Sequence, residues 1–213
     1  QRRLSAALGR AIRRFLSPAQ APDRRVGHAQ AATADETRAL MPFVRFPNWH
    51  FCSRCRVLWK VPWNTPKNDS RLRCSSDIRL KKGTAKTCSE LPDWKKPFLI
   101  PVRFAVACPS GHIMEFPWEE WAHLNKTKCG AGSGKLFLAA TGAVGLAGVE
   151  VKCSQCQARR TLIGAFGPDP FRRIWSDLCP GHRPWLGPDA TQRDCTEIPV
   201  TVQRGASNTY FAE

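Results

Sequence analysis

Cysteine-containing turns constrain the fold more than any other feature of this 213-residue sequence. Two sulfurs separated by two residues fit one edge of a zinc tetrahedron when the backbone turns between them. Two pairs have this spacing, Cys52 with Cys55 and Cys153 with Cys156. Two further turns place a cysteine near a histidine, Cys108 with His112 and Cys179 with His182. The spacing favours metal binding over an extracellular disulfide framework, which remains the alternative. No secretory signal is expected, because arginines interrupt the apolar stretch near the start.

The candidate ligands divide into three groups of four by their order along the chain, and four ligands close a structural zinc site. The predicted groups are Cys52, Cys55, Cys74 and Cys88; Cys108, His112, His123 and Cys129; and Cys153, Cys156, Cys179 and Cys195. His182 is an alternative to Cys179 or Cys195 in the third group. Cys74, Cys88 and Cys195 have a second interpretation as buried free thiols, and His123 as a surface residue that ends a helix. The sequence thus predicts two or three structural zinc ions.

Catalytic motifs are weak or absent. A closed four-ligand site leaves no open position for water, and neither the deaminase nor the H-E-x-x-H zinc pattern occurs. The GAGSGK segment at 130–135 lacks the first glycine and the final serine or threonine of a phosphate loop, and a strand is predicted after it. Glu150-Val151-Lys152 resembles one end of a nuclease motif, but no suitably placed aspartate precedes it. The chain is therefore predicted not to be an enzyme.

Positive charge dominates the composition. Lysine and arginine number 33 against 17 aspartates and glutamates, a formal net charge of +16. This charge favours an acidic partner, and nucleic acid is the commonest one. Seven arginines are candidates for contacts with DNA phosphates, namely Arg103, Arg159, Arg160, Arg172, Arg173, Arg183 and Arg204. Aromatic residues interleaved with basic ones can stack on bases, but Trp118 and Trp121 share one helix face and are predicted to belong to the core.

The chain is expected to have three parts. Apolar residues at helical spacing among arginines predict a basic amphipathic helix over residues 1–18, for which a nucleic-acid arm, a packed surface helix and a transit peptide are all open. Residues 19–42 predict a linker, and residues 43–213 a zinc-bearing α+β domain. The expected fold has short antiparallel strands and short helices organised around zinc knuckles. Strands are predicted at 99–107, 112–116, 135–140, 148–152 and 198–203, and a helix at 117–123. The longest nearly apolar run, 136–149, is too short for a bilayer, so no membrane partner is expected.

Several phrases of the sequence resemble the DrmB family of the DISARM bacterial anti-phage systems. They are RFPNWHFCSRC at 45–55, PVRFAVACPSGHIMEFPWEEWAH at 101–123, CSQCQARRTLIGAFG at 153–167, RPWLG at 183–187 and QRGASNTYF at 203–211. Within them, seven ligand candidates occupy motif positions of the family, namely Cys52, Cys55, Cys108, His112, His123, Cys153 and Cys156. The family continues beyond its QRGASN phrase, so the chain is expected to be a fragment of a longer protein.

The resemblance implies a zinc-bearing partner of a DrmA-type helicase that acts with it on phage DNA and has no motor of its own. It also implies a cytoplasmic location, which agrees with reduced, metal-bound cysteines. We therefore expect a non-enzymatic, DNA-binding accessory subunit that contacts DNA mainly through phosphates. Two alternatives remain open: a zinc-ribbon scaffold that binds only protein, and a metal-dependent nuclease.

Overall fold

The computed structural model divides the chain into two units, Gln1–Val44 and Arg45–Glu213. It describes residues 45–62, 72–78, 86–124, 129, 134–167, 169–176, 178–187, 189–192 and 194–205, together with Gly9. Apart from Gly9, the predicted helix at 1–18 and linker at 19–42 lie outside the described residues. Within the described part of the chain, no helix is long and apolar enough to cross a bilayer.

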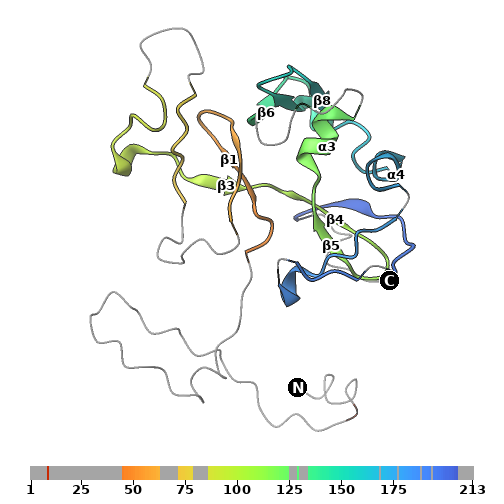
Figure 1. Cartoon of the computed structure of the whole chain (residues 1–213). Coiled ribbons are helices and arrows are strands. Elements are labelled where there is room, and N and C mark those ends of the chain that lie inside the picture. The colour runs from red at the N-terminus through yellow and green to blue at the C-terminus, as the bar shows by residue number, and fades with distance from the viewer. Residues whose placement is uncertain are drawn as a thin grey trace, which may run out of the picture. The chain divides into compact units, whose positions relative to one another are not determined.

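In the described part of the second unit, the strands form three small antiparallel sheets of three strands each (Figure 1). Their strand orders are β2-β1-β3, β5-β4-β9 and β6-β7-β8. The strands are β1 (Trp49–Cys52), β2 (Leu58–Lys60), β3 (Leu99–Pro101), β4 (Phe104–Ala107), β5 (Ile113–Glu115), β6 (Leu136–Ala140), β7 (Val149–Cys153), β8 (Arg159–Thr161) and β9 (Val200–Gln203). The helices are α3 (Trp118–His123), α4 (Asp169–Trp175) and the 3-10 turns η1 (Asp93–Lys95), η2 (Gly145–Gly148) and η3 (Pro184–Leu186). The predicted α+β class with short antiparallel strands is confirmed.

The predicted strand at 99–107 is two strands in two different sheets. β3 pairs with β1, whereas β4 pairs with β5 and β9. The chain changes sheet at Val102, a buried residue whose backbone N–H donates to the carbonyl of Trp49. The mostly apolar composition on both sides of Val102 favours one continuous strand, and only Pro101 and Arg103 interrupt it.

The main core forms around α3. Trp118 and Trp121 are fully buried, as predicted, and Phe116 lies with its ring centroid 4.6 Å from that of Trp118 and 5.4 Å from that of Trp121. The helix contacts β7, β8 and α4, and the indole N–H of Trp121 donates to the carbonyl of Thr161 on β8 at 3.1 Å. A smaller separate core surrounds Cys52, Cys55, Cys74 and Cys88. Three-stranded sheets bury little apolar area alone. We therefore expect the cysteine clusters to contribute much of the stability of the fold.

Candidate metal centres

Three tetrads of cysteine and histidine side chains lie in the described residues. The ligand atoms within each tetrad all lie within 4.8 Å of one another. The tetrads are Cys52, Cys55, Cys74 and Cys88; Cys108, His112, Cys179 and Cys195; and His123, Cys129, Cys153 and Cys156. All ten cysteines are free thiols, and the sulfur–sulfur distances are too long for disulfides. Because a zinc ion with Zn–S bonds of about 2.3 Å has sulfur–sulfur edges of about 3.8 Å, the tetrads are consistent with zinc sites.

The first tetrad contains four thiols. Cys52 ends β1, and the chain turns so that the backbone N–H of Cys55 points at the Cys52 sulfur, 3.4 Å away. Arg56 closes the turn in the left-handed region with φ 63°. The Cys55 and Cys74 sulfurs lie 3.6 Å apart, and those of Cys52 and Cys88 4.0 Å apart. The structure therefore brings the four members of the predicted first group together, although Cys74 and Cys88 do not form a C-x-x-C motif.

The second tetrad lies at the turn between β4 and β5. The Cys108 sulfur is 3.3 Å from Nδ1 of His112 and 3.9 Å from the Cys195 sulfur, and the Cys179 sulfur is 3.8 Å from the same Nδ1. On the other side of the ring, Nε2 of His112 is 3.2 Å from the Gln192 side-chain oxygen. An Nε2–H donated to Gln192 leaves the Nδ1 lone pair directed at the three sulfurs, which is the tautomer a metal requires.

The third tetrad connects α3 to the turn between β7 and β8. The Cys129 sulfur lies 3.5 Å from Nε2 of His123 and 3.6 Å from the Cys153 sulfur. Nδ1 of His123 is 2.6 Å from the carbonyl of Glu119 one helical turn earlier. The helix backbone therefore fixes the His123 tautomer, and Nε2 is free to bind a metal. His123 is 7% exposed, which excludes its interpretation as a surface residue that only ends the helix.

The predicted second and third groups are wrong, because the last two members of each belong to the other group. His123 and Cys129 join the Cys153 turn, and Cys179 and Cys195 join the Cys108 turn. Sheet pairing explains the exchange, because β9 follows Cys195 and pairs with β4, which ends beside Cys108. Likewise α3 contacts β7 and β8, so its last residue, His123, meets their turn. Grouping by chain order fails because it ignores this long-range pairing.

His182 does not enter any tetrad. It bridges to Thr191, and burial, aided by the charge of Lys60, lowers its pKa. The sequence analysis also missed Gln192, which accepts a hydrogen bond from the guanidinium of Arg183 as well as contacting His112. Gln192 lies in an exposed segment with no ligand motif, so only the folded structure reveals its position beside His112.

One glycine of the GAGSGK segment has a structural role. A Cβ at Gly134 would lie 2.7 Å from the Cys153 sulfur, so only glycine allows the backbone to pass this close to the third tetrad. β6 begins at Leu136 where a phosphate loop needs a helix, which confirms the predicted strand.

Each tetrad contains one thiol that is more acidic than a free cysteine. Although burial alone would raise the pKa values of Cys52 and Cys153, backbone N–H groups of their turns lower both. The pKa of Cys195 falls to about 7 for the same reason, with the Glu197 N–H as the main cause opposing burial. In contrast, burial raises the pKa to about 11 for Cys88 and Cys129 and to about 12 for Cys179. A bound cation would stabilise the thiolate forms of Cys88, Cys129 and Cys179 at neutral pH.

The seven predicted phosphate-contacting arginines lie in separate places. Arg103 and Arg204 are adjacent, and the Arg204 N–H donates to the Arg103 carbonyl at 2.8 Å. The others lie on β8 (Arg159 and Arg160), on α4 (Arg172 and Arg173), and beside Gln192 (Arg183). The structure thus brings the β8 and α4 pairs to one region, through α3, and leaves the remaining arginines elsewhere.

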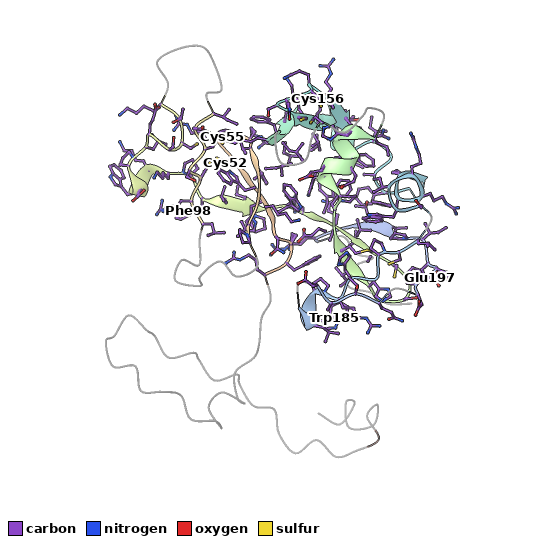
Figure 2. All side chains as sticks on the ribbon, in the orientation of Figure 1. Cys52, Cys55, Phe98, Cys156, Trp185 and Glu197 are labelled. Carbon is purple, nitrogen blue, oxygen red and sulfur yellow. The ribbon has the colours of Figure 1, made fainter. Side chains whose placement is uncertain are left out.

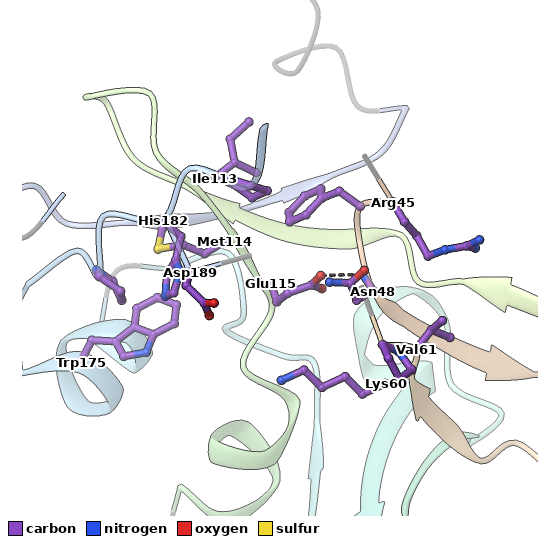
Figure 3. Close-up of a pocket in the computed structure, with 14 residues that line it drawn as sticks. Arg45, Asn48, Lys60, Val61, Ile113, Met114, Glu115, Trp175, His182 and Asp189 are labelled. Carbon is purple, nitrogen blue, oxygen red and sulfur yellow. Dashed lines mark hydrogen bonds between the residues drawn. The ribbon is translucent and has the colours of Figure 1, made fainter. Parts of the chain in front are cut away.

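A cavity of about 630 Å³ is lined by a half-buried acid (Figure 3). Glu115 extends from β5 toward Asn48, whose backbone N–H donates to Glu115 Oε1 at 2.5 Å. Oε2 of the same carboxylate is buried and has no hydrogen-bond partner among the described residues. Burial raises the pKa of Glu115, against the opposing effects of the Asn48 N–H and the Lys60 charge.

Replacement of Glu115 by glutamine is expected to stabilise the fold by about 1 kcal/mol at pH 7. A carboxyl with a raised pKa binds more protons folded than unfolded, so stability falls as pH rises through the folded pKa. Glutamine carries no charge, so its advantage should grow as pH rises from about 4 to neutral. Urea unfolding at several pH values tests this, and an advantage that is equal at all pH values would contradict it.

Together, the small sheets and the three tetrads define a class of protein, an α+β domain with three candidate metal centres. The chain belongs to the family described as a domain of unknown function, DUF8724, which matches residues 1–211.

The chain is also similar to the DISARM protein DrmB of Bacillus paralicheniformis. It is 33% identical to that protein over 175 residues, which cover 80% of this chain. The match covers 27% of the relative, so the chain spans about a quarter of its length. The resemblance noted in the sequence is therefore confirmed, and the chain is a DrmB-related domain.

Proposed function

We propose that this chain is a zinc-stabilised, non-catalytic domain of a DISARM anti-phage system that binds DNA through its phosphates and partners a DrmA-type helicase. Similarity to a DISARM protein DrmB supports the defence context. The three tetrads support structural metal, and the net charge of +16 supports an anionic partner.

Zinc is the metal that the donor atoms favour. The first tetrad has four thiols, and each of the other two has three thiols and one imidazole. Thiolate with imidazole in tetrahedral geometry is typical of structural zinc, and four protein ligands leave no position for a reacting water. These closed sites support a role in folding rather than hydrolysis.

We expect three zinc ions per folded chain by elemental analysis. After cobalt substitution, absorption spectra should show one all-sulfur site and two sites with one nitrogen ligand. His123→Cys should keep three ions and convert one nitrogen-containing site into an all-sulfur site. One or two ions in a fully folded chain would contradict the assignment.

Basic residues on and around β8 support the DNA proposal. Arg160 on β8 lies with its guanidinium carbon 4.6 Å from the centroid of the Trp121 ring, and its Nε has no hydrogen-bond partner among the described residues. Burial lowers the pKa of Arg160, and the nearby charge of Arg173 on α4 lowers it further. On the other face of β8, Arg159 lies directly opposite Lys152 of β7. Like charges placed opposite each other destabilise a sheet, and a bound phosphate removes that penalty.

Changing Arg159 and Arg160 together to glutamate is expected to weaken DNA binding about tenfold or more, without sequence preference, and to flatten its salt dependence. Fluorescence anisotropy at several salt concentrations measures both effects, and a thermal melt checks the fold. The control variant has glutamate in place of Arg45 and Lys60, which line the cavity. It makes the same change in net charge and should weaken DNA binding less than the Arg159 and Arg160 variant does. If the Arg159 and Arg160 variant binds DNA with the same affinity and the same salt dependence as the unaltered chain, β8 is not part of the DNA-binding surface.

The protein-only scaffold is the second candidate, and exposed apolar side chains favour it. Leu178, Trp185 and Leu186 are 53%, 50% and 64% exposed. If the chain captures the helicase but shows no salt-dependent DNA binding, the scaffold is the better description. A plasmid-cleavage time course with magnesium or manganese tests the nuclease alternative, and we expect no cleavage.

A further inference from the structure

Exposed aromatic rings and basic side chains meet on the part of the chain that carries the first tetrad. We define the aromatic–basic patch as Arg73, Trp94, Lys95, Lys96 and Phe98. Trp94 on η1 is 73% exposed, and Phe98, directly before β3, is 38% exposed. Figure 2 shows Phe98 on the same part of the ribbon as Cys52 and Cys55, away from Trp185. A tryptophan this exposed has no role in either core.

Arg73 holds the patch together. Its guanidinium carbon lies 4.2 Å from the Phe98 ring centroid, and its Nη1 donates to the Lys96 carbonyl at 3.0 Å. The next residue, Cys74, belongs to the first tetrad and donates its N–H to the Pro97 carbonyl at 2.8 Å. The patch is therefore anchored to a metal centre, so a ligand would order little additional backbone on binding.

Each ring of the patch has a cation over one of its faces. Nζ of Lys95 lies 4.6 Å from the Trp94 ring centroid, as the Arg73 guanidinium lies over Phe98. The acid in η1 is Asp93, which pairs with Lys96 at 2.7 Å. Three cations with one carboxylate give the patch a positive charge around apolar rings, which complements a polyanion with flat apolar groups better than it does an apolar protein groove.

We propose that the aromatic–basic patch is a stacking site for unpaired bases of single-stranded DNA, an inference that rests on the proposed DNA-binding function. Unpaired bases expose faces that stack on aromatic side chains, whereas bases in a duplex are already stacked on one another. Trp94 and Phe98 provide the stacking surfaces, and Arg73 and Lys95 lie where they can reach the phosphates between the bases. Duplex DNA can contact only the basic side chains of the patch, through its phosphates.

The test compares a single strand of about 12 nucleotides with a duplex of the same sequence. Trp94→Ala in the whole chain is expected to weaken single-strand binding about 5- to 100-fold, because stacking contributes on that scale per base. Its duplex binding should change less than twofold. Trp94→Phe should retain most of the single-strand affinity, and Lys95→Gln should weaken both forms and flatten the salt dependence.

Trp185→Ala is the matched control. Trp185 is 50% exposed on η3, outside the patch, so its loss should leave single-strand binding unchanged. If Trp94→Ala binds the single strand as the unaltered chain does, or if both variants lose affinity equally, the stacking site is wrong while the proposed DNA binding stands. Failure of the unaltered chain to bind either form overturns both proposals. Loss of helicase capture by Trp94→Ala, with single-strand binding intact, identifies a protein surface instead.

Discussion

Removing metal with a strong chelator is expected to unfold residues 45–205 of the chain. Apparent binding free energies of structural zinc are roughly 10 kcal/mol or more per site, which exceeds the net stability of a typical domain. Without a cation, the thiols of Cys88, Cys129 and Cys179, whose pKa values are raised mainly by desolvation, would remain protonated. Circular dichroism during chelation measures the loss of structure, and added zinc should restore it.

Reductant without chelator is the control, and it should leave the domain folded because no disulfide is present among the ten cysteines. Acid should release the metal for a related reason: protons compete with it for the thiols and imidazoles. Unfolding by reductant, with resistance to chelator, would contradict the metal assignment.

Trp121→Ala is expected to cost about 3–5 kcal/mol in the free energy of unfolding. The substitution removes a fully buried indole, its contact with Phe116 and its hydrogen bond to the Thr161 carbonyl. It also loosens α3, whose last residue is the metal ligand His123, so the third tetrad should release its ion at lower chelator concentration. Urea unfolding and metal competition measure the two effects.

Trp94→Ala is the matched control for Trp121→Ala, because Trp94 is 73% exposed. Its loss should change the free energy of unfolding by less than about 0.5 kcal/mol. A similar cost for both variants would mean that burial in the α3 core is not what stabilises the fold.

Local sequence predicted the ligands well and their grouping poorly. C-x-x-C turns are local structures, so Cys52 with Cys55 and Cys153 with Cys156 were found directly from the sequence. Which second pair completes a site depends on the pairing of β9 with β4 and on the packing of α3, and neither is encoded in local spacing. Grouping by chain order brings the first tetrad together because its four members come first along the chain and no member of another tetrad precedes them or lies between them.

The sequence also predicted some elements of secondary structure and missed others. The helix at Trp118–His123 and the strands β5, β6, β7 and β9 lie where the sequence predicted them. The strands β1, β2 and β8 and the helix α4 were not predicted. Their length does not explain this, because β5 has only three residues and α3 only six, and both were predicted. Metal-ligand geometry and tertiary contacts, rather than propensity, stabilise such short elements.

The second and third tetrads are nested along the chain, and this determines the order in which they are completed during synthesis. Cys108 and Cys195 are 87 residues apart, and every member of the third tetrad, from His123 to Cys156, lies between them. During synthesis, all ligands of the first tetrad are made first, and all ligands of the third tetrad are made next. At that stage Cys108 and His112 have been made, but Cys179 and Cys195 have not. Until residue 179 emerges from the ribosome, that half-site has one thiol beside an imidazole, and it is complete only when Cys195 has also emerged.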